Sequence, residues 1–378
     1  MRNKGKKIKH YKGSFDTGRF KRRRIIRGIV ILILLFIAGY FLAPRILDVG
    51  TRLWYEGVKR YEESSNSQSQ SIDNPPSNDS SQSESEPIVE PTPTPVPEPE
   101  GNWSVVSTAS VATPELAQQT AQQLAQQGVK YALITLKAAD GTIGYASAVP
   151  TAAGSISATP FDARAAADAM KQAGIVPVAE LWAYRDPIAA YSDRTMAIGY
   201  GASEGMLWLD NSAQAGGKPW LNPYSPTARQ YIQDLALEVV SLGYEQIVFS
   251  GLHFPEVRST NGANFGDTQG KSFDAILNET IQQLQAVLKE HNAIAWFQYS
   301  AAAVTGEDLR IAAAPVGGLA MERLLVQIPA DTADPVATLA ACAAAAGEKT
   351  KIYRVPAAPD EVLQQAANAN GYKQAVIG

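Results

Sequence analysis

The chain has 378 residues, of which 45% are hydrophobic and 19% charged, and its formal net charge is -4. This length is enough for one large hydrophobic core or two smaller ones. Cys342 is the only cysteine, which excludes an internal disulfide framework and with it the class of small disulfide-rich secreted proteins.

Charge is distributed very unevenly at the N-terminal end of the chain. Residues 1–27 hold 12 Lys or Arg and a single acidic residue, Asp16, whereas residues 62–100 hold nine Asp or Glu and no Lys or Arg. Blocks of like charge at this density are usually solvated and unstructured. We therefore expect neither block to belong to the folded core.

An uncharged apolar run of 16 residues, 28–43, lies between these two blocks. As a helix it falls slightly short of the hydrocarbon core of about 30 Å, but the flanking Arg27 and Arg45 can snorkel. We predict a transmembrane helix over residues 25–47, in contact with the lipid bilayer. Residues 1–24 then form a basic cytoplasmic tail by the positive-inside rule, and no nucleic acid partner is expected. A cleaved signal peptide is the alternative, although no small-x-small cleavage site cleanly follows the apolar run.

Residues 48–100 are predicted to be a juxtamembrane segment followed by a disordered stalk. The first part carries Trp54, Tyr55 and Tyr61, which suit the headgroup level of a membrane. The Ser-, Asn- and Glu-rich part cannot bury enough apolar surface to fold, and the alternating prolines favour polyproline geometry. The chain is therefore expected to be a single-pass protein of a bacterial cell membrane, with residues 101–378 outside the cell.

Residues 101–378 alternate short apolar runs with helical stretches that are rich in Ala, Gln and Leu. Expected helices cover 114–127, 163–173, 226–242, 273–290, 333–346 and 359–367, with Thr113 and Ser225 as N-caps. Expected strands lie at 103–108, 131–137, 175–184, 246–251, 293–300, 324–329 and 351–356. Seven or eight such units predict an α/β fold, a (β/α)8 TIM-like barrel whose site lies at the C-terminal ends of the strands. No nucleotide-binding glycine motif and no metal-ligand spacing occurs, so no cofactor and no metal are expected.

One segment, residues 216–256, is rich in recognisable motifs: GGKPWLNPYSPTARQYIQDLALEVVSLGYEQIVFSGLHFPE. It resembles the "putative glycoside hydrolase" family of bacterial TIM barrels, once a domain of unknown function. In that family W-x-[DN]-P-[YF]-S precedes a helix, and L-G-[FY]-[DE]-E-I leads into a strand that ends F-D-Y-x-R-F-P. Residues 131–147 and 173–190 look like the family motifs V-I-D-x-K-[DN]-x-x-G-x-[VI]-x-Y and G-I-x-x-x-A-R-x-x-x-F-x-D-P. The resemblance spans about residues 103–378 and implies a barrel of glycosidase ancestry.

The chain departs from these motifs at the expected strand ends. Thr135 and Ser250 stand where the family has Asp, Glu180 stands where it has Arg, and His253 stands where it has a second Arg. Glycoside hydrolysis needs a carboxylic acid and a second carboxylate about 5 to 9.5 Å apart. Ser and Thr can supply neither group at neutral pH. The resemblance therefore implies a barrel that has lost acidic residues.

Five carboxylates lie at or beyond expected strand ends: Glu180, Asp186, Asp210, Glu256 and Glu322. Glu180 and Glu256 are the candidate catalytic residues if the chain is an active enzyme. Three of the five carboxylates also have a simpler interpretation. Glu180 could pair with a neighbouring barrel Arg or Lys, Asp186 could start a turn before Pro187, and Glu256 could be a solvated loop residue.

The predicted substrate-binding residues combine aromatic rings with two polar side chains. They are Trp182, Tyr184, Asp186, Trp208, Trp220, Tyr224, His253 and Tyr299. Aromatic rings can stack on sugar faces, although core packing would explain about half of them. Ser250 and His253 could suggest a hydrolase triad, but the G-x-S-x-G elbow is absent and no acid partner is identifiable.

Two functions of different class follow from the sequence. The first is a catalytically degenerate barrel that binds cell-wall or surface carbohydrate, such as a polysaccharide or peptidoglycan glycan, or a protein partner. The second is an active glycoside hydrolase that uses relocated carboxylates. The loss of two acids at separate strand ends favours the first.

Overall fold

The computed structural model of the chain describes residues 101–202 and 205–378. The predicted cytoplasmic tail, the transmembrane helix at 25–47 and the stalk lie outside the described residues. Among the helices of the described part, none has the length and apolar character needed to cross a bilayer.

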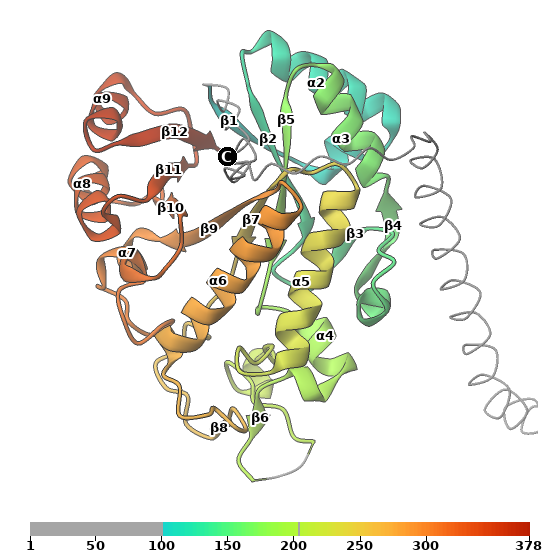
Figure 1. Cartoon of the computed structure of the whole chain (residues 1–378), viewed down its shortest axis with the longest axis vertical. Coiled ribbons are helices and arrows are strands. Elements are labelled where there is room, and N and C mark those ends of the chain that lie inside the picture. The colour runs from blue at the N-terminus through green and yellow to red at the C-terminus, as the bar shows by residue number, and fades with distance from the viewer. Residues whose placement is uncertain (1–100, 203–204) are drawn as a thin grey trace, which may run out of the picture. The chain divides into compact units, whose positions relative to one another are not determined.

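Eight parallel strands close into a barrel (Figure 1). In chain order they are β1 (Trp103–Val106), β2 (Tyr131–Lys137), β5 (Val176–Trp182), β7 (Gln246–Ser250), β9 (Ile294–Ser300), β10 (Arg323–Gln327), β11 (Thr350–Val355) and β12 (Tyr372–Ile377). β1 pairs in parallel with both β2 and β12, and these two pairings close the sheet. The predicted (β/α)8 barrel is thereby confirmed for this part of the chain.

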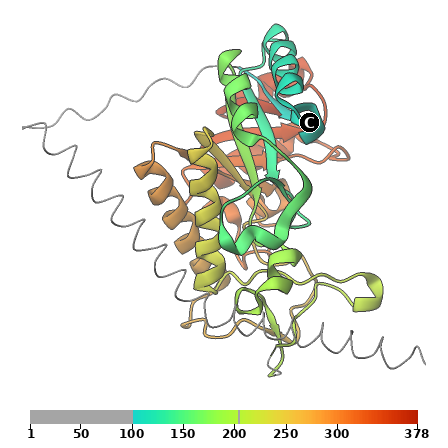
Figure 2. The same cartoon turned by 90° about the vertical axis from the view of Figure 1, so that its right-hand side faces the viewer.

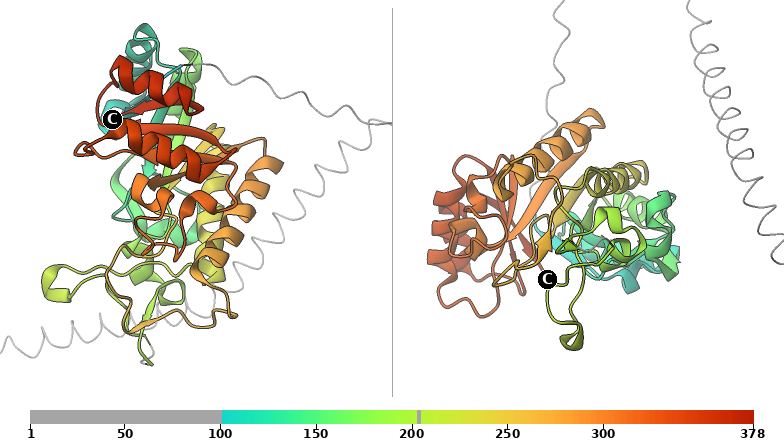
Figure 3. Two further views of the ribbon diagram at one scale, coloured as in Figure 1. Left: turned by 90° about the vertical axis from the view of Figure 1, so that its left-hand side faces the viewer. Right: turned by 90° about the horizontal axis from the view of Figure 1, so that it is seen from below.

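Helices cover the outside of the barrel, and all of the following except the short α7 lie where the sequence predicts them. They are α2 (Pro114–Gln126), α3 (Ala163–Gln172), α5 (Pro226–Ser241), α6 (Phe273–Glu290), the short α7 (Ala301–Thr305), α8 (Pro335–Ala346) and α9 (Glu361–Ala369). The expected caps are present, because Thr113 accepts a hydrogen bond from the Leu116 amide and Ser225 accepts one from the Ala228 amide. Helices α7, α8 and α9 pack beside one another along β9 to β12 (Figure 3).

Large side chains fill the barrel near the beginnings of its strands. Trp103 stacks on Tyr131 at a ring separation of 4.7 Å and meets Trp296 edge-on at 5.6 Å. Aliphatic residues complete this inner core, among them Leu133, Val178, Val248, Leu325 and Ile352. The barrel is therefore closed by apolar packing at one end, and polar side chains gather toward the other.

The last strand, β12, is absent from the sequence-based expectation, which ended with a helix at 359–367. Its sequence YKQAVI interrupts the apolar run with Lys373 and Gln374, so it lacks the continuous apolar character of a buried parallel strand. It is a barrel strand because it hydrogen-bonds to β11 on one side and to β1 on the other. Closure of the sheet thus places β12 between two strands, although its own sequence does not show the pattern of a buried strand.

Long connections leave the C-terminal ends of β2, β5 and β7. The first holds β3 (Ile143–Tyr145), η2 (Pro150–Ser155) and β4 (Ile156–Phe161). Two other links hold 3-10 turns: η1 (Thr108–Val111) follows β1, and η5 (Val316–Gly318) precedes β10. The second and third connections hold α4 (Pro187–Ser192), η3 (Arg194–Met196), β6 (Gly199–Tyr200), η4 (Ala213–Ala215) and β8 (Ala263–Asn264). β6 pairs with β8, and Figure 1 shows both near α4 at one end of the barrel. The loop around η4 projects outward, as the yellow-green segment in Figure 2 shows.

Candidate functional site

A cavity of about 770 Å³ opens at the C-terminal ends of the strands. Its lining comes from the ends of β5, β7, β9 and β10 and from the long connections that follow β5 and β7. This is where TIM barrels carry their sites, and the volume is typical of small-molecule pockets. The sequence-based expectation about the position of the site therefore coincides with this cavity.

Three aromatic side chains line the cavity: Trp182, Trp220 and Tyr299. The Trp220 indole donates a 3.0 Å hydrogen bond to Asp210 Oδ2, and the Tyr299 hydroxyl donates one of 2.9 Å to the Leu252 carbonyl. Burial raises the pKa of Tyr299 far above its ordinary value, so its hydroxyl remains protonated at any physiological pH. These rings are held in place by polar contacts as well as by packing.

Trp182 is positioned by a buried ion pair. Lys137 Nζ donates a 2.6 Å hydrogen bond to the Trp182 carbonyl and lies 2.9 Å from Asp186 Oδ2. Both charged side chains are buried, and Asp186 also caps α4 by accepting from the Ala189 amide at 2.9 Å. Gly251 gives the indole its space, since an added Cβ would lie 2.9 Å from Trp182 Cε3. Asp186 therefore lies behind the cavity wall. It starts the turn before Pro187, which is the simpler interpretation given for it in the sequence analysis.

His253 lies against the aromatic wall, the name we give to Trp182, Trp220 and Tyr299. Its ring centroid is 5.8 Å from that of Trp220 and 6.5 Å from that of Tyr299. Its Nδ1 is 2.7 Å from the Phe254 carbonyl oxygen, which can only accept, so Nδ1 carries a proton. Its Nε2 lies 3.6 Å from Glu256 Oε1. Burial lowers the pKa of His253, and we therefore expect a neutral ring at pH 7 whose Nε2 is an acceptor.

Two carboxylates line the cavity: Asp210 and Glu256. Asp210 Oδ1 accepts from the Lys218 amide at 2.7 Å while Oδ2 accepts from Trp220. The Glu256 side chain is 56% exposed. Glu256 is thus the more accessible of the two.

Glu180 is 3% exposed and is not part of the cavity lining. Its Oε2 accepts a 2.6 Å hydrogen bond from Thr135, and its Oε1 accepts from Ser250 at 2.8 Å and from Arg354 Nη1 at 3.3 Å. Arg354 also donates to Gln298 Oε1 at 3.1 Å. Of the two interpretations of Glu180, the structure supports the one in which it pairs with a barrel Arg.

Three positions at which the chain departs from the family motifs therefore lie in one cluster. Thr135 and Ser250, which the motif resemblance places at Asp positions, both donate to Glu180, which it places at an Arg position. Thr135 and Glu180 are register partners on β2 and β5, so the strand pairing itself brings them together. We call Thr135, Glu180, Ser250, Gln298 and Arg354 the barrel cluster.

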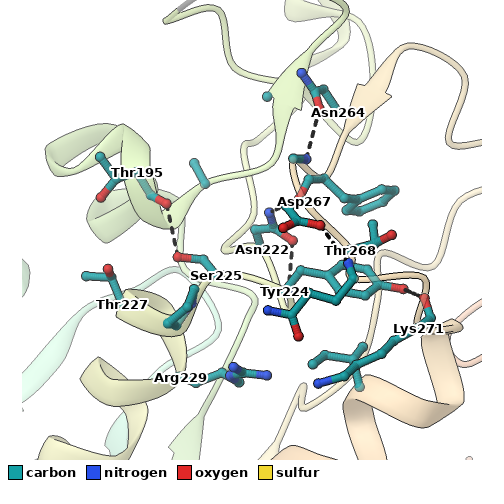
Figure 4. A pocket seen from close by; sticks show the side chains of 17 residues that line it. Thr195, Asn222, Tyr224, Ser225, Thr227, Arg229, Asn264, Asp267, Thr268 and Lys271 are labelled. Atoms are coloured by element: carbon teal, nitrogen blue, oxygen red, sulfur yellow. Dashed lines mark hydrogen bonds between the residues drawn. The ribbon is translucent and has the colours of Figure 1, made fainter.

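The remaining predicted site residues lie elsewhere. Tyr184 is fully buried with its hydroxyl 3.2 Å from Thr280, and burial raises its pKa to about 12. Trp208 is buried and donates to the Asn261 carbonyl at 3.2 Å. Tyr224 lines a different cavity of about 470 Å³, where its hydroxyl donates to the Lys271 carbonyl (Figure 4). Of the predicted substrate-binding residues, the cavity brings together Trp182, Trp220, His253 and Tyr299.

The cavity also has polar lining residues that the sequence did not single out: Arg185, Lys218, Gln298 and Gln327. Gln298 and Gln327 lie in the C-terminal halves of apolar strands, and a polar residue at such a position is a signal that could have been used. Arg185 and Lys218 belong to the connection after β5, for which the sequence has no periodic pattern.

Comparisons with known proteins agree with this fold. A family model described as "Putative glycosyl hydrolase domain" matches residues 105–313. The glycoside hydrolase domain of PgaB (BpsB) from Bordetella bronchiseptica aligns with a TM-score of 0.52 and 12% identity over 74% of this chain and 94% of that domain. A hypothetical protein from Ruminiclostridium thermocellum aligns at 0.44 with 20% identity, over 51% of this chain and 95% of that one. At 12% identity the likeness to the Bordetella domain shows the fold alone, and among curated proteins none matches the chain.

Proposed function

The chain belongs to the family described as "Putative glycosyl hydrolase domain", and from this premise we propose that its barrel binds carbohydrate without cleaving it. The observation that carries the proposal is the aromatic-lined cavity at the strand ends, set beside a barrel cluster in which hydroxyls replace the family's acids. The partly exposed Trp182 indole offers a flat apolar surface for a sugar ring, while Trp220 and Tyr299 are 5% and 3% exposed and form the rest of the aromatic wall beside it. The ligand class is a cell-wall or surface polysaccharide, including peptidoglycan glycan.

Chemistry argues against a catalytic role for Glu180. A general acid must reach the glycosidic oxygen and a nucleophile must reach the anomeric carbon. Both oxygens of Glu180 are engaged by Thr135, Ser250 and Arg354, and the side chain is buried outside the cavity lining. Glu180 is better explained as the acceptor that satisfies these three donors.

One observation favours the alternative, an active glycoside hydrolase with relocated carboxylates. Asp210 and Glu256 both line the cavity, and His253 beside Glu256 has a free acceptor nitrogen. In that mechanism Glu256, rather than Glu180, would be one of the two carboxylates, with Asp210 as the other. The Asp210 carboxylate already accepts two hydrogen bonds, which weakens its candidacy as a proton donor.

We further propose that the barrel is displayed outside a bacterial cell on a membrane anchor formed by residues 25–47. The support comes from the sequence: 12 Lys or Arg before the apolar run and a charged, proline-rich segment after it. A reporter that is active only outside the cytoplasm, fused after residue 378 in a bacterial host, should be active. An inactive reporter there, with an active cytoplasmic reporter at the same point, would contradict this topology.

Carbohydrate binding is tested with the full chain in detergent micelles. Purified peptidoglycan and soluble polysaccharides are the ligands in a sedimentation assay, and reducing-sugar release is measured in the same samples. We expect retention without release. Trp182→Ala should reduce retention, while Tyr191→Ala, a matched loss of an exposed aromatic residue that does not line the cavity, should not.

Two results would overturn the preference for binding alone. Sugar release by the parent chain that disappears in Glu256→Gln would support the hydrolase instead. Absence of retention on every carbohydrate, together with retention of a protein partner, would replace carbohydrate binding with protein recognition.

A further inference from the structure

Two cations line the strand-end cavity without an ionic partner in the part of the chain that the structure describes. Arg185 and Lys218 both contribute to its lining. Within residues 101–202 and 205–378 neither side chain forms an ion pair, and neither donates a hydrogen bond. Arg310, which precedes the lining residue Ile311, differs from them because it pairs with Asp308 at 2.6 Å. The cavity therefore presents positive charge that its own surroundings leave uncompensated by direct contact.

The cavity's two carboxylates make no direct contact with these cations among the described residues. Asp210 accepts from the Lys218 backbone amide and from Trp220, and its contacts involve neither the Lys218 ammonium nor Arg185. Glu256 Oε1 lies 3.6 Å from His253 Nε2. The available charged donors in the cavity are accordingly the guanidinium of Arg185 and the ammonium of Lys218.

Arg185 lies over the Trp182 ring in the cavity lining. Its guanidinium carbon is 6.0 Å from the Trp182 ring centroid, within reach of a cation-π contact. A saccharide ring near this indole would have its substituents beside the guanidinium. The planar fork of an Arg matches the two oxygens of a carboxylate or phosphate, and such charge-assisted pairs are about twice as strong as neutral hydrogen bonds.

We propose that the cavity recognises an anionic glycan, a saccharide that carries carboxylate or phosphate groups, with Arg185 as the specificity-determining residue and Lys218 as a second cationic contact. This inference rests on the proposed carbohydrate binding and specifies its ligand class. Arg185 selects the ligand by charge, while the aromatic wall supplies affinity that does not depend on charge. Neutral sugars of the same size should therefore bind, but more weakly.

The test compares three oligosaccharides of equal length: one neutral, one carrying uronic acid carboxylates and one carrying phosphate. Each is titrated calorimetrically into the full chain in detergent micelles, at low salt and at high salt. We expect at least one of the two anionic ligands to bind about tenfold or more tightly than the neutral one, with the difference shrinking as salt rises. Comparison of the carboxylated and phosphorylated ligands identifies which of the two anionic groups the cavity binds more tightly.

The variant Arg185→Gln should remove the preference for the anionic ligand, so that neutral and anionic oligosaccharides bind it with equal affinity. Arg258→Gln makes the same charge change at an exposed Arg outside the cavity lining and should preserve the preference. Equal affinity for neutral and anionic ligands, or a preference that survives Arg185→Gln, would overturn the inference and leave carbohydrate binding intact. Failure of all three oligosaccharides and of cell-wall polymer to bind would instead remove the proposed function itself.

Discussion

The barrel cluster and the strand-end cavity hold carboxylates in opposite circumstances. In the barrel cluster, Glu180 is 3% exposed and accepts hydrogen bonds from two hydroxyls and one guanidinium. In the cavity, Glu256 is 56% exposed and is 3.6 Å from a neutral histidine nitrogen. The two glutamates were equal candidates as catalytic residues on sequence, and their surroundings now separate them.

The difference shows what burial does to a charged group. A carboxylate removed from water needs fixed donors, and those donors occupy the oxygens that chemistry would use. An exposed carboxylate keeps its oxygens available but contributes little to stability. Removal of charged groups from the two environments should therefore give effects of very different size.

The largest effect is expected from Lys137→Met, which leaves Asp186 without its cation in the buried layer behind Trp182. Breaking a buried ion pair on one side typically costs about 3 to 5 kcal/mol of unfolding free energy. Urea unfolding followed by tryptophan fluorescence measures this loss. The control Lys171→Met breaks the exposed pair with Glu245 and should cost less than about 1 kcal/mol. Equal losses in the two variants would refute the contrast.

Glu180→Gln should cost less, about 1.5 to 3 kcal/mol, which is the range for hydrogen bonds to a charged group. The amide keeps the shape of the carboxylate but leaves Arg354 without a counter-ion. Carbohydrate retention should persist at temperatures where the variant is folded, because Glu180 does not line the cavity. Loss of retention in a folded Glu180→Gln protein would restore Glu180 as a functional residue. The same would follow if the parent chain released sugar and this variant did not.

A third prediction concerns pH and His253. Its pKa is lowered in the folded state, first by burial and also by the charge of Arg185, although the Phe254 carbonyl, Glu256 and Asp308 oppose the shift. The unfolded chain then binds more protons, so stability decreases as pH falls below about 6.5. Each unit of lowering costs about 1.4 kcal/mol at a pH below both pKa values.

His253→Gln removes this titration. The difference in unfolding free energy between the parent chain and the variant should be constant above pH 7.5 and should change in favour of the variant as pH falls. Denaturant titrations from pH 5 to pH 8 measure it. Parallel pH profiles for the two proteins would show that His253 is not the group responsible.

The smallest effect is expected from Glu256→Gln. The side chain is more than half exposed, and surface substitutions of this kind usually change stability by no more than about 0.5 kcal/mol. A thermal unfolding scan against the parent chain checks this. A loss of 2 kcal/mol or more would mean that Glu256 is held by contacts as strong as those of Glu180, and the contrast between the two regions would fail.

Sequence predicted the elements of the barrel closely, because its signals are local. Thr113 and Ser225 lie at the N-termini of their helices, and the predicted helix at 273–290 has the observed bounds. Periodicity and capping depend on neighbours within one or two turns, which the chain itself displays. β12 was missed because its environment comes from β1, which lies at the other end of the domain's sequence.

The residues of the candidate site were predicted less well than the elements of the barrel. Aromatic residues near strand ends were identifiable, yet half of the predicted substrate-binding set proved to lie outside the cavity, including Tyr184 in the core and Asp186 beneath Trp182. Sequence places a residue near a strand end but does not determine which way its side chain faces in an irregular connection. The cationic lining residues Arg185 and Lys218 escaped notice for the same reason.

By itself the sequence determined the parallel barrel, its family and the barrel end at which a site is expected, since hydrophobic period, caps and motif residues are properties of short segments. Only the tertiary structure decided that Thr135, Glu180, Ser250 and Arg354 form one cluster, in which Glu180 and Arg354 are 174 positions apart. Such contacts depend on strand register and barrel closure, which are collective properties of all eight strands. That collective geometry buries one candidate glutamate among three hydrogen-bond donors and leaves the other in the cavity.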